Sequence, residues 1–122
     1  MIFQRSSEYN IDLNVKSDGG WTTFHKACVY GSLEVVKILL QKSNELKIDL
    51  NSKNKNGITA FNLACLLGME KVVNMILENA EFFEIDLIAK ENEGRTGFQC
   101  AQDNEKKNVV DLIKRKMPSI AF

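Results

Sequence analysis

Few residues in this chain could do chemistry, and the most suggestive pair is His25 with Cys28. His25 is the only histidine, and its spacing from Cys28 would place both side chains on one helix. Together they could provide a thiolate nucleophile with its base, or two ligands of a metal ion. A hydrolase of this kind predicts that Cys28 reacts with thiol reagents faster than Cys65. Because neither a second histidine nor a third ligand accompanies the pair, we predict that the chain is not an enzyme and holds no metal and no cofactor.

Other patterns of catalytic or ligand-binding residues are missing from the sequence. Gly19-Gly20 lacks both the lysine and the later glycine of a phosphate-binding loop. The carboxylates are scattered over polar segments, so no two of them are predicted to form an acid–base pair. Sixteen Lys and Arg balance sixteen Asp and Glu, which favours neither nucleic acid nor an anionic membrane as a partner. The basic run Lys114-Arg115-Lys116 is typical of a solvated helix end, with a nuclear address or a phosphate contact as the alternatives.

The strongest pattern in the sequence is a repeat of 37 residues. The motif Ile-Asp-Leu-Asn at Ile11 returns at Ile48, and Ile-Asp-Leu-Ile follows at Ile85. Glycines keep the same interval at positions 20, 57 and 94. A period of this length is typical of a solenoid, in which each unit buries its apolar face only by stacking on its neighbours. Such a protein is expected to act through an exposed surface rather than an enclosed pocket.

Each repeat predicts a turn, a short helix, a second turn and a second helix. A polar stretch rich in Asn, Asp and Gly comes first and favours a tight hairpin. A threonine then stands where a helix N-cap belongs, namely Thr22, Thr59 or Thr96. Apolar residues follow at spacings of three and four, as one face of a helix requires. Gly31 and Gly68 end these first helices, and apolar residues at helical spacing resume over 33–40 and 72–77.

Together these segments resemble the ankyrin repeat. The resemblance rests on Gly-Trp-Thr-Thr-Phe-His-Lys-Ala-Cys over 20–28 with Gly31, on 57–65 with Gly68, and on 94–114. It implies an all-α fold, an ankyrin-type helix-turn-helix solenoid with short β-hairpin or loop protrusions. It also implies that His25 holds the hairpin by hydrogen bonds, with Asn62 and Gln99 in the equivalent places. Cys28 and Cys65 are then small buried groups, and we expect all three cysteines to be free thiols.

The resemblance extends over the whole chain and divides it into repeats. We expect a single domain, 1–122, with the tail of a partial repeat at 1–17, repeats at 18–54 and 55–91, and a C-terminal capping repeat at 92–122. Each unit is about four residues longer than the usual ~33, and the surplus around 43–46 predicts one more helical turn. The last repeat carries Glu105 in place of the inter-helix glycine and turns polar at Gln102, as a cap would. We therefore expect a C-terminal fragment of a longer array, or an abbreviated N-terminal cap.

The resemblance places the binding surface on the hairpin tips and on the exposed side of the first helices. The residues selected in this way are Asp18, Trp21, Val29, Tyr30, Lys55, Asn56, Ile58, Leu66, Leu67, Asn92, Glu93, Arg95, Asp103 and Asn104. Two repeats supply an apolar and aromatic centre, and the third supplies a polar, charged flank, which is typical of protein interfaces. Trp21 and Tyr30 are the strongest candidates. For Val29, Leu66 and Leu67, the alternative that they only help the first helices to stack stays open.

The predicted function is a protein–protein interaction module that presents a rigid concave surface to a protein partner of unknown identity. The alternative is a structural spacer, or a self-associating fragment of a longer array with no partner of its own. We expect a monomer, with a dimer through Ile2 and Phe3 of the incomplete first repeat as the other option. The start of the chain lacks the order of a signal peptide, and no apolar run reaches membrane-spanning length. We therefore expect an intracellular protein, in either the cytoplasm or the nucleus.

Overall fold

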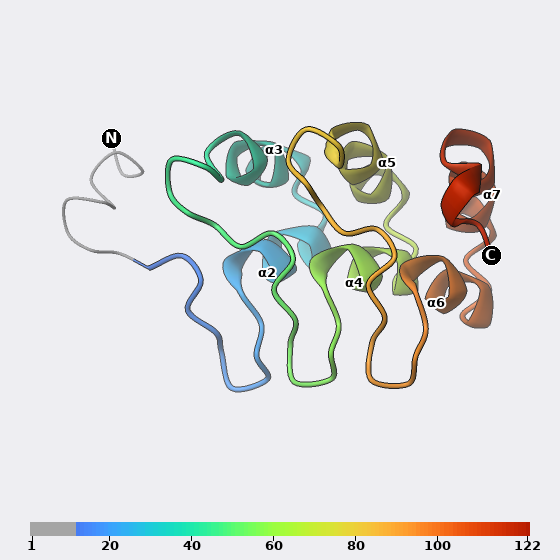
Figure 1. Cartoon of the computed structure of the whole chain (residues 1–122), viewed down its shortest axis with the longest axis horizontal. Helices are drawn as coiled ribbons and strands as arrows, with labels where there is room; N and C mark the ends of the chain where they lie inside the picture. The colour runs from blue at the N-terminus through green and yellow to red at the C-terminus, as the bar shows by residue number, and fades with distance from the viewer. Residues whose placement is uncertain (1–11) are drawn as a thin grey trace.

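The computed structural model describes residues 12–122, and within them the fold is a row of stacked helix pairs (Figure 1). The helices are α2 (Thr23–Tyr30), α3 (Leu33–Gln41), α4 (Ala60–Leu66), α5 (Glu70–Asn79), α6 (Gly97–Asp103), α7 (Lys107–Lys116) and the 3₁₀ helix η1 (Pro118–Ile120). The first helices α2, α4 and α6 form one layer, the second helices α3, α5 and α7 form another, and long loops project from the first layer. The predicted all-α solenoid is confirmed. No residue of 12–122 is assigned to a β-strand, so the protrusions are hairpin-shaped loops, or hairpins, without strands.

Each first helix begins at the threonine that the sequence predicted as its N-cap. The backbone N–H groups of His25, Asn62 and Gln99 donate to the Oγ atoms of Thr22, Thr59 and Thr96, with N···O distances of 3.3, 3.1 and 3.3 Å. These bonds satisfy amides that a helix start otherwise leaves free. In the first and third repeats a second bond completes a capping box: the backbone N–H of the threonine donates to the side chain of the residue three positions later, His25 or Gln99.

The two helices of each pair are joined through a left-handed backbone residue. Gly31 and Gly68 have φ angles of 69° and 72°, a region in which only glycine avoids a steric cost. Gly31 caps α2 directly, whereas α4 is capped by Leu67 and Gly68 follows it. In the third pair Glu105 adopts the same conformation with a φ of 56°. The third repeat therefore keeps the turn although it lacks the glycine.

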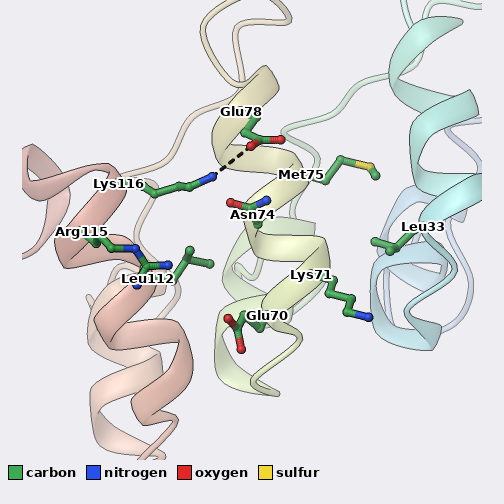
Figure 2. Close-up of a pocket in the computed structure, with 9 residues that line it drawn as sticks. All are labelled: Leu33, Glu70, Lys71, Asn74, Met75, Glu78, Leu112, Arg115 and Lys116. Carbon is green, nitrogen blue, oxygen red and sulfur yellow. Dashed lines mark hydrogen bonds and ion pairs between the residues drawn. The ribbon is translucent and has the colours of Figure 1, made fainter.

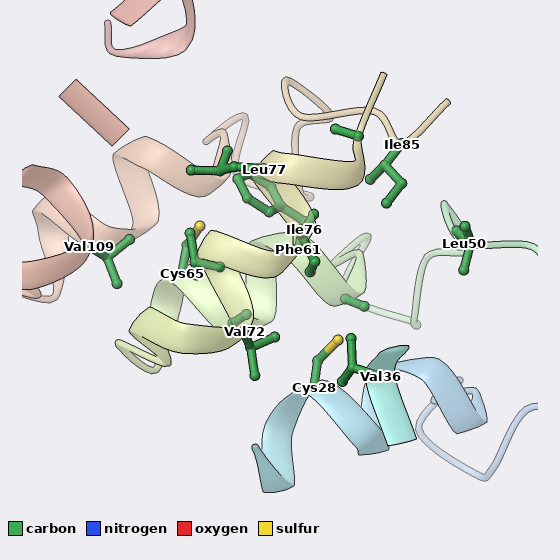
Figure 3. Packing of buried hydrophobic residues seen from close by; sticks show 14 of the residues in the cluster. Cys28, Val36, Leu50, Phe61, Cys65, Val72, Ile76, Leu77, Ile85 and Val109 are labelled. Carbon is green, nitrogen blue, oxygen red and sulfur yellow. The ribbon is translucent and has the colours of Figure 1, made fainter. Parts of the chain in front are cut away.

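The core is one continuous cluster of buried apolar residues that runs through all three helix pairs (Figure 3). Phe24, Phe61 and Phe98 stand at equivalent repeat positions, and each is no more than 2% exposed. A Cβ atom added to Gly97 would lie 2.9 Å from the Phe61 ring and 3.1 Å from the Sγ of Cys65. The close packing of α6 on α4 therefore depends on the absence of a side chain at Gly97.

The last helix pair has a polar outer face. Cys28 and Cys65 are fully buried, whereas Gln102 at the equivalent position is exposed. The same replacement occurs in the second helices, where Leu77 is buried and Lys114 is exposed. Polar side chains at positions that pack apolar residues in the earlier repeats are expected of a capping repeat. The proposed division at 18, 55 and 92 stays a prediction.

The repeated Ile-Asp-Leu-Asn motif connects each repeat to the next. The Nδ2 of Asn14 donates to the carbonyl of Lys47 at 2.8 Å, and the backbone N–H of Asp49 donates to the Oδ1 of Asn14 at 2.7 Å. Asn51 makes the same pair of bonds one repeat later, to the carbonyl of Glu84 at 3.0 Å and from the N–H of Asp86 at 2.8 Å. The motif is therefore a side-chain ladder that fixes the spacing of successive loops.

Further bonds between residues 36 or 37 positions apart tie the loops together. The Nζ of Lys16 donates to the carbonyl of Lys53 at 2.9 Å, and Lys53 donates in turn to that of Lys90 at 3.2 Å. At the loop tips the backbone N–H of Lys55 donates to the carbonyl of Gly19 at 3.1 Å. An equivalent backbone bond joins residues 92 and 56 at 3.0 Å. These contacts hold the protruding loops in register without forming a sheet.

The extra residues of each repeat form one additional turn beyond the second helix, which is close to what the sequence predicted. α3 ends at Gln41, and the N–H of Leu46 donates to the carbonyl of Lys42 at 2.9 Å in the segment that follows. The turn is separate from the helix and ends at Lys47, which has a φ of 55°. Glu84 ends the corresponding turn after α5 with the same φ.

Ile2 and Phe3, on which the predicted dimer depends, lie outside the described residues.

Candidate protein-binding surface

His25 has a structural environment that accounts for all of its polar atoms. Its Nδ1 accepts a hydrogen bond from the backbone N–H of Thr22 at 3.1 Å, and its Nε2 lies 2.8 Å from the carbonyl of Ile58 in the next repeat. The ring therefore carries its proton on Nε2 and donates to Ile58. Burial lowers the pKa of His25, the bond to Ile58 acts in the opposite direction, and the charge of Lys16 adds to the lowering. This arrangement matches the hairpin-holding role that the resemblance implied.

Gln99 and Asn62, which are equivalent to His25 in the other repeats, make different hydrogen bonds. Gln99 accepts from the N–H of Thr96 at 3.0 Å, as His25 does from Thr22. Asn62 has a shorter side chain, and its Nδ2 donates instead to the carbonyl of Ala89 at 3.1 Å. The Oδ1 of Asn62 is buried without a hydrogen-bond partner. The second repeat therefore lacks the reciprocal cap that the first and third repeats have.

The cysteines are unsuited to nucleophilic chemistry. All three are free and buried. Burial raises the pKa of Cys28 to about 12 and raises the pKa of Cys65 well above its ordinary value, with nearby Cys100 adding to the effect in Cys65. A thiolate forms too rarely at neutral pH to act as a nucleophile under these conditions. Among residues 12–122, no group of three or more His, Cys, Asp or Glu side chains is placed to hold a metal ion.

None of the residues that the sequence selected for partner binding is buried. The exposed members of this set are Asp18, Tyr30, Lys55, Asn56, Leu67, Asn92, Glu93, Asp103 and Asn104, and the half-buried members are Trp21, Val29, Ile58, Leu66 and Arg95. Tyr30 is the most accessible apolar side chain of the set at 81%, and Leu67 follows at 42%. Both lie at the C-terminal end of a first helix, one repeat apart. They form an apolar row along the first-helix layer.

Trp21 is held in place beside the hairpin turn. Its ring lies 6.2 Å from the His25 ring, measured between centroids. A Cβ atom added to Gly19 would lie 3.2 Å from its Cδ1. The indole is thus partly covered by its own hairpin and partly open. Because Trp21 also packs near a buried histidine, its removal would affect the hairpin as well as the surface.

Arg95 forms the centre of a charge cluster in the third repeat. Its guanidinium donates to the Oε2 of Glu91 at 3.1 Å and to the Oδ2 of Asp103 at 3.2 Å, and it lies 3.2 Å from the Oε1 of Glu93. Hydrogen bonds to Glu91 and Asp103 raise the pKa of Arg95. Burial acts to raise the pKa of Glu91, but the bonds from Arg95 outweigh it and hold that pKa below its ordinary value. Arg95 is therefore already committed to contacts within its own repeat.

The bond between Arg95 and Asp103 also shows how the hairpin faces the first helix. In the 37-residue register these two positions are occupied by Trp21 and Val29 in one repeat, and by Ile58 and Leu66 in the next. All four of these side chains are half-buried. Apolar pairs thus occupy the junction of hairpin and helix in the first two repeats, and a salt bridge occupies it in the third. Repeats of one backbone therefore present surfaces of different chemistry.

A groove of about 380 Å³ lies on the other layer of the molecule, between α5 and α7 (Figure 2). It is bounded by the ion pair of Lys116 with Glu78, whose atoms are 2.9 Å apart. The hydrogen bond from Lys116 lowers the pKa of Glu78. The Oδ1 of Asn74 is buried in this groove without a hydrogen-bond partner. None of the predicted surface residues lines it, and the basic run that contains Lys116 was the only part of it singled out from the sequence.

Phe82 is an exposed aromatic residue that the sequence interpretation missed. It is 80% exposed and stacks edge-on against Phe83, with the ring centroids 4.8 Å apart. Phe82 stands at the position of Glu45 in the preceding repeat, so its departure from the repeat pattern was a readable signal. It lies in the turn after α5, on the second-helix layer. It therefore does not belong to the row formed by Tyr30 and Leu67.

A stack of antiparallel helix pairs joined by protruding loops defines a helical repeat protein. The family model for ankyrin repeats in three copies matches residues 2–88, and the chain belongs to the ankyrin-repeat family. The third helix pair lies beyond the matched residues but keeps the same N-cap, inter-helix turn and stacking. No curated protein was found to match the chain. Within residues 12–122, no helix is both long and apolar enough to cross a membrane.

Proposed function

We propose that this chain is a protein-binding module whose binding surface consists of the loop tips and the exposed side of α2, α4 and α6. Ankyrin repeats generally serve as protein–protein interaction modules. The observation that carries the proposal here is the apolar row in which Tyr30, 81% exposed, stands one repeat from Leu67, 42% exposed. Accessible aromatic and aliphatic side chains that adjoin a polar flank are typical of interfaces between proteins.

The module would work by rigid presentation of its side chains. The bonds from Asn14 and Asn51 to neighbouring loops, together with the backbone bonds at the loop tips, hold successive repeats in register before a partner arrives. A surface that is ordered in advance loses little conformational entropy on binding. The His25 bond to the carbonyl of Ile58 extends this order from the helix layer to the next hairpin. We propose no catalytic step, no cofactor and no metal.

The proposed partner is a protein rather than nucleic acid or a membrane. The balance of sixteen basic and sixteen acidic residues provides no general attraction for a polyanion. We further propose that the chain acts as a monomer inside the cell. Three buried free thiols are compatible with a reducing compartment, in either the cytoplasm or the nucleus.

The experiment that tests the proposal is affinity capture from a cell lysate with the whole chain as bait, read by quantitative mass spectrometry. The test variant is Tyr30→Ala with Leu67→Ala, which removes the apolar row. The control variant is Phe82→Ala with Val35→Ala, because these side chains are 80% and 41% exposed and lie on the second-helix layer. The two variants thus truncate apolar side chains of nearly equal exposed fraction, one pair on each helix layer.

The expected result is a protein that the parent and the control variant retain and that the test variant loses. Loss of more than about tenfold in retained protein fits the removal of central interface anchors. Equal retention by all three chains would place the binding elsewhere and refute this surface. Capture of nothing specific by the parent would favour the alternative of a structural spacer. Circular dichroism of each variant establishes that it is folded before the comparison is made.

A further inference from the structure

Charged side chains are distributed unevenly along the proposed binding surface. In the third repeat the Arg95 guanidinium contacts the carboxylates of Glu91, Glu93 and Asp103, so three negative charges face one positive charge. The side chains of Glu93 and Asp103 are 74% and 54% exposed, and both remain accessible to a partner. Glu91 is 5% exposed and is satisfied within the hairpin. The third repeat therefore presents a net negative surface through Glu93 and Asp103.

The corresponding junction of hairpin and first helix is apolar in the first two repeats. The positions of Arg95 and Asp103 are taken there by Trp21 with Val29 and by Ile58 with Leu66. Tyr30 and Leu67 extend this region along the ends of the first helices. The junction of hairpin and helix thus changes from apolar to acidic along the direction of stacking, whereas the hairpin tips of the first two repeats carry the exposed charges of Asp18 and Lys55. The change at the junction arises because equivalent positions of the shared backbone carry different residues.

We propose that the partner is a protein segment in which bulky apolar side chains are followed, in either chain direction, by lysine or arginine. This inference rests on the proposed function and specifies its partner. The apolar side chains would cover Tyr30 and Leu67, and the basic side chains would pair with Glu93 and Asp103. Because Arg95 is already bound within its repeat, it does not repel a basic partner as a free guanidinium would.

The spacing of the repeats sets the spacing expected within the partner. Packed helices lie about 8–10 Å apart, so Tyr30, Leu67 and Asp103, which adjoins the equivalent third position at Asn104, span roughly 20 Å. An extended chain advances about 3.3 Å per residue. Two apolar residues about three positions apart, with a basic residue about three positions further, would match the surface. This pattern distinguishes the proposal from general attachment of an apolar peptide.

The test is selection of a displayed library of random peptides, each of about twelve residues, long enough for this spacing, against the whole chain. The affinity of enriched peptides is then measured by fluorescence anisotropy. Glu93→Gln with Asp103→Asn neutralises the acidic flank, while Glu34→Gln with Glu81→Gln makes the same charge change at exposed sites outside this surface. We expect enrichment of apolar residues followed by Lys or Arg. The flank variant should bind such peptides about three- to tenfold more weakly, and the control variant should bind as the parent does.

Salt dependence of the parent chain provides a measurement that needs no substitution. Affinity should fall as ionic strength rises, because accessible ion pairs are screened. Enriched peptides that depend on Tyr30 and Leu67 but show no basic residue would overturn the inference and leave the proposed function intact. Acidic peptides, or no enriched peptide that depends on these residues, would also overturn it. The proposed function fails separately, if capture from lysate does not depend on Tyr30 and Leu67.

Discussion

Replacing Glu105 with glycine should stabilise the protein. Glu105 has a φ of 56°, at the turn where the other two repeats have glycine. The left-handed conformation costs an L-residue about 1–2 kcal/mol, whereas glycine adopts it freely. Glycine also raises the entropy of the unfolded chain, which offsets about 0.5–1 kcal/mol of this gain. The expected net increase in the free energy of unfolding is therefore about 0.5–1 kcal/mol.

Urea unfolding followed by circular dichroism measures this difference, and a rise in Tm of about 2–5 °C should accompany it. The matched control is Gln102→Gly, since Gln102 is also exposed but lies within α6. Glycine inside a helix should lower the free energy of unfolding by about 0.5–1 kcal/mol. The two substitutions should thus have opposite signs although they lie three residues apart. If both destabilise the protein to the same extent, the argument from backbone strain at Glu105 is wrong.

Two further predictions concern the bonds that link the repeats. Asn51→Ala removes the bonds to the carbonyl of Glu84 and from the N–H of Asp86; because these groups can be rehydrated, we expect a loss of about 1–2 kcal/mol in urea unfolding. Asn44→Ala, at an exposed turn residue, should change the free energy by less than about 0.5 kcal/mol, and equal effects would contradict the ladder. The second prediction is that acid destabilises the fold through His25, whose pKa is lowered mainly by burial. The unfolded chain binds a proton below about pH 6.5 more readily than the folded chain does, so the free energy of unfolding should fall as pH drops from about 7.5 to 5.5. His25→Gln should remove this dependence, since the chain has one histidine, and an unchanged slope in that variant would refute the assignment.

Several local features could be predicted because their causes are local. Thr22, Thr59 and Thr96 cap their helices because a hydroxyl at that position reaches a free backbone amide a few residues away. Gly31 and Gly68 mark left-handed turns because few other residues adopt that conformation without cost. The period of 37 residues predicted a stack because a single helix pair cannot bury its own apolar face.

Other features could not be predicted because they depend on contacts between repeats. The Ile-Asp-Leu-Asn motif was visible as a repeat, but the reach of Asn14 to the carbonyl of Lys47 appears only when the loops are stacked. Arg95 was selected as a binding residue from its position alone. Its bonds to Glu91 and Asp103 show that its positive charge is paired with carboxylates of the same repeat. The exposed Phe82 was missed because the interpretation followed the pattern and not its exceptions.

The sequence by itself determined the family, the all-α stack and the order of turns and helices, because these follow from spacing, capping and glycine positions that act over a few residues. The tertiary structure decided which polar side chains are free to meet a partner. Glu93 and Asp103 remain accessible while the two terminal nitrogens of Arg95 are paired with carboxylates, and this difference arises from distances between a hairpin and a helix. Such distances depend on how the layers pack, and packing is a property of the whole stack rather than of any one repeat.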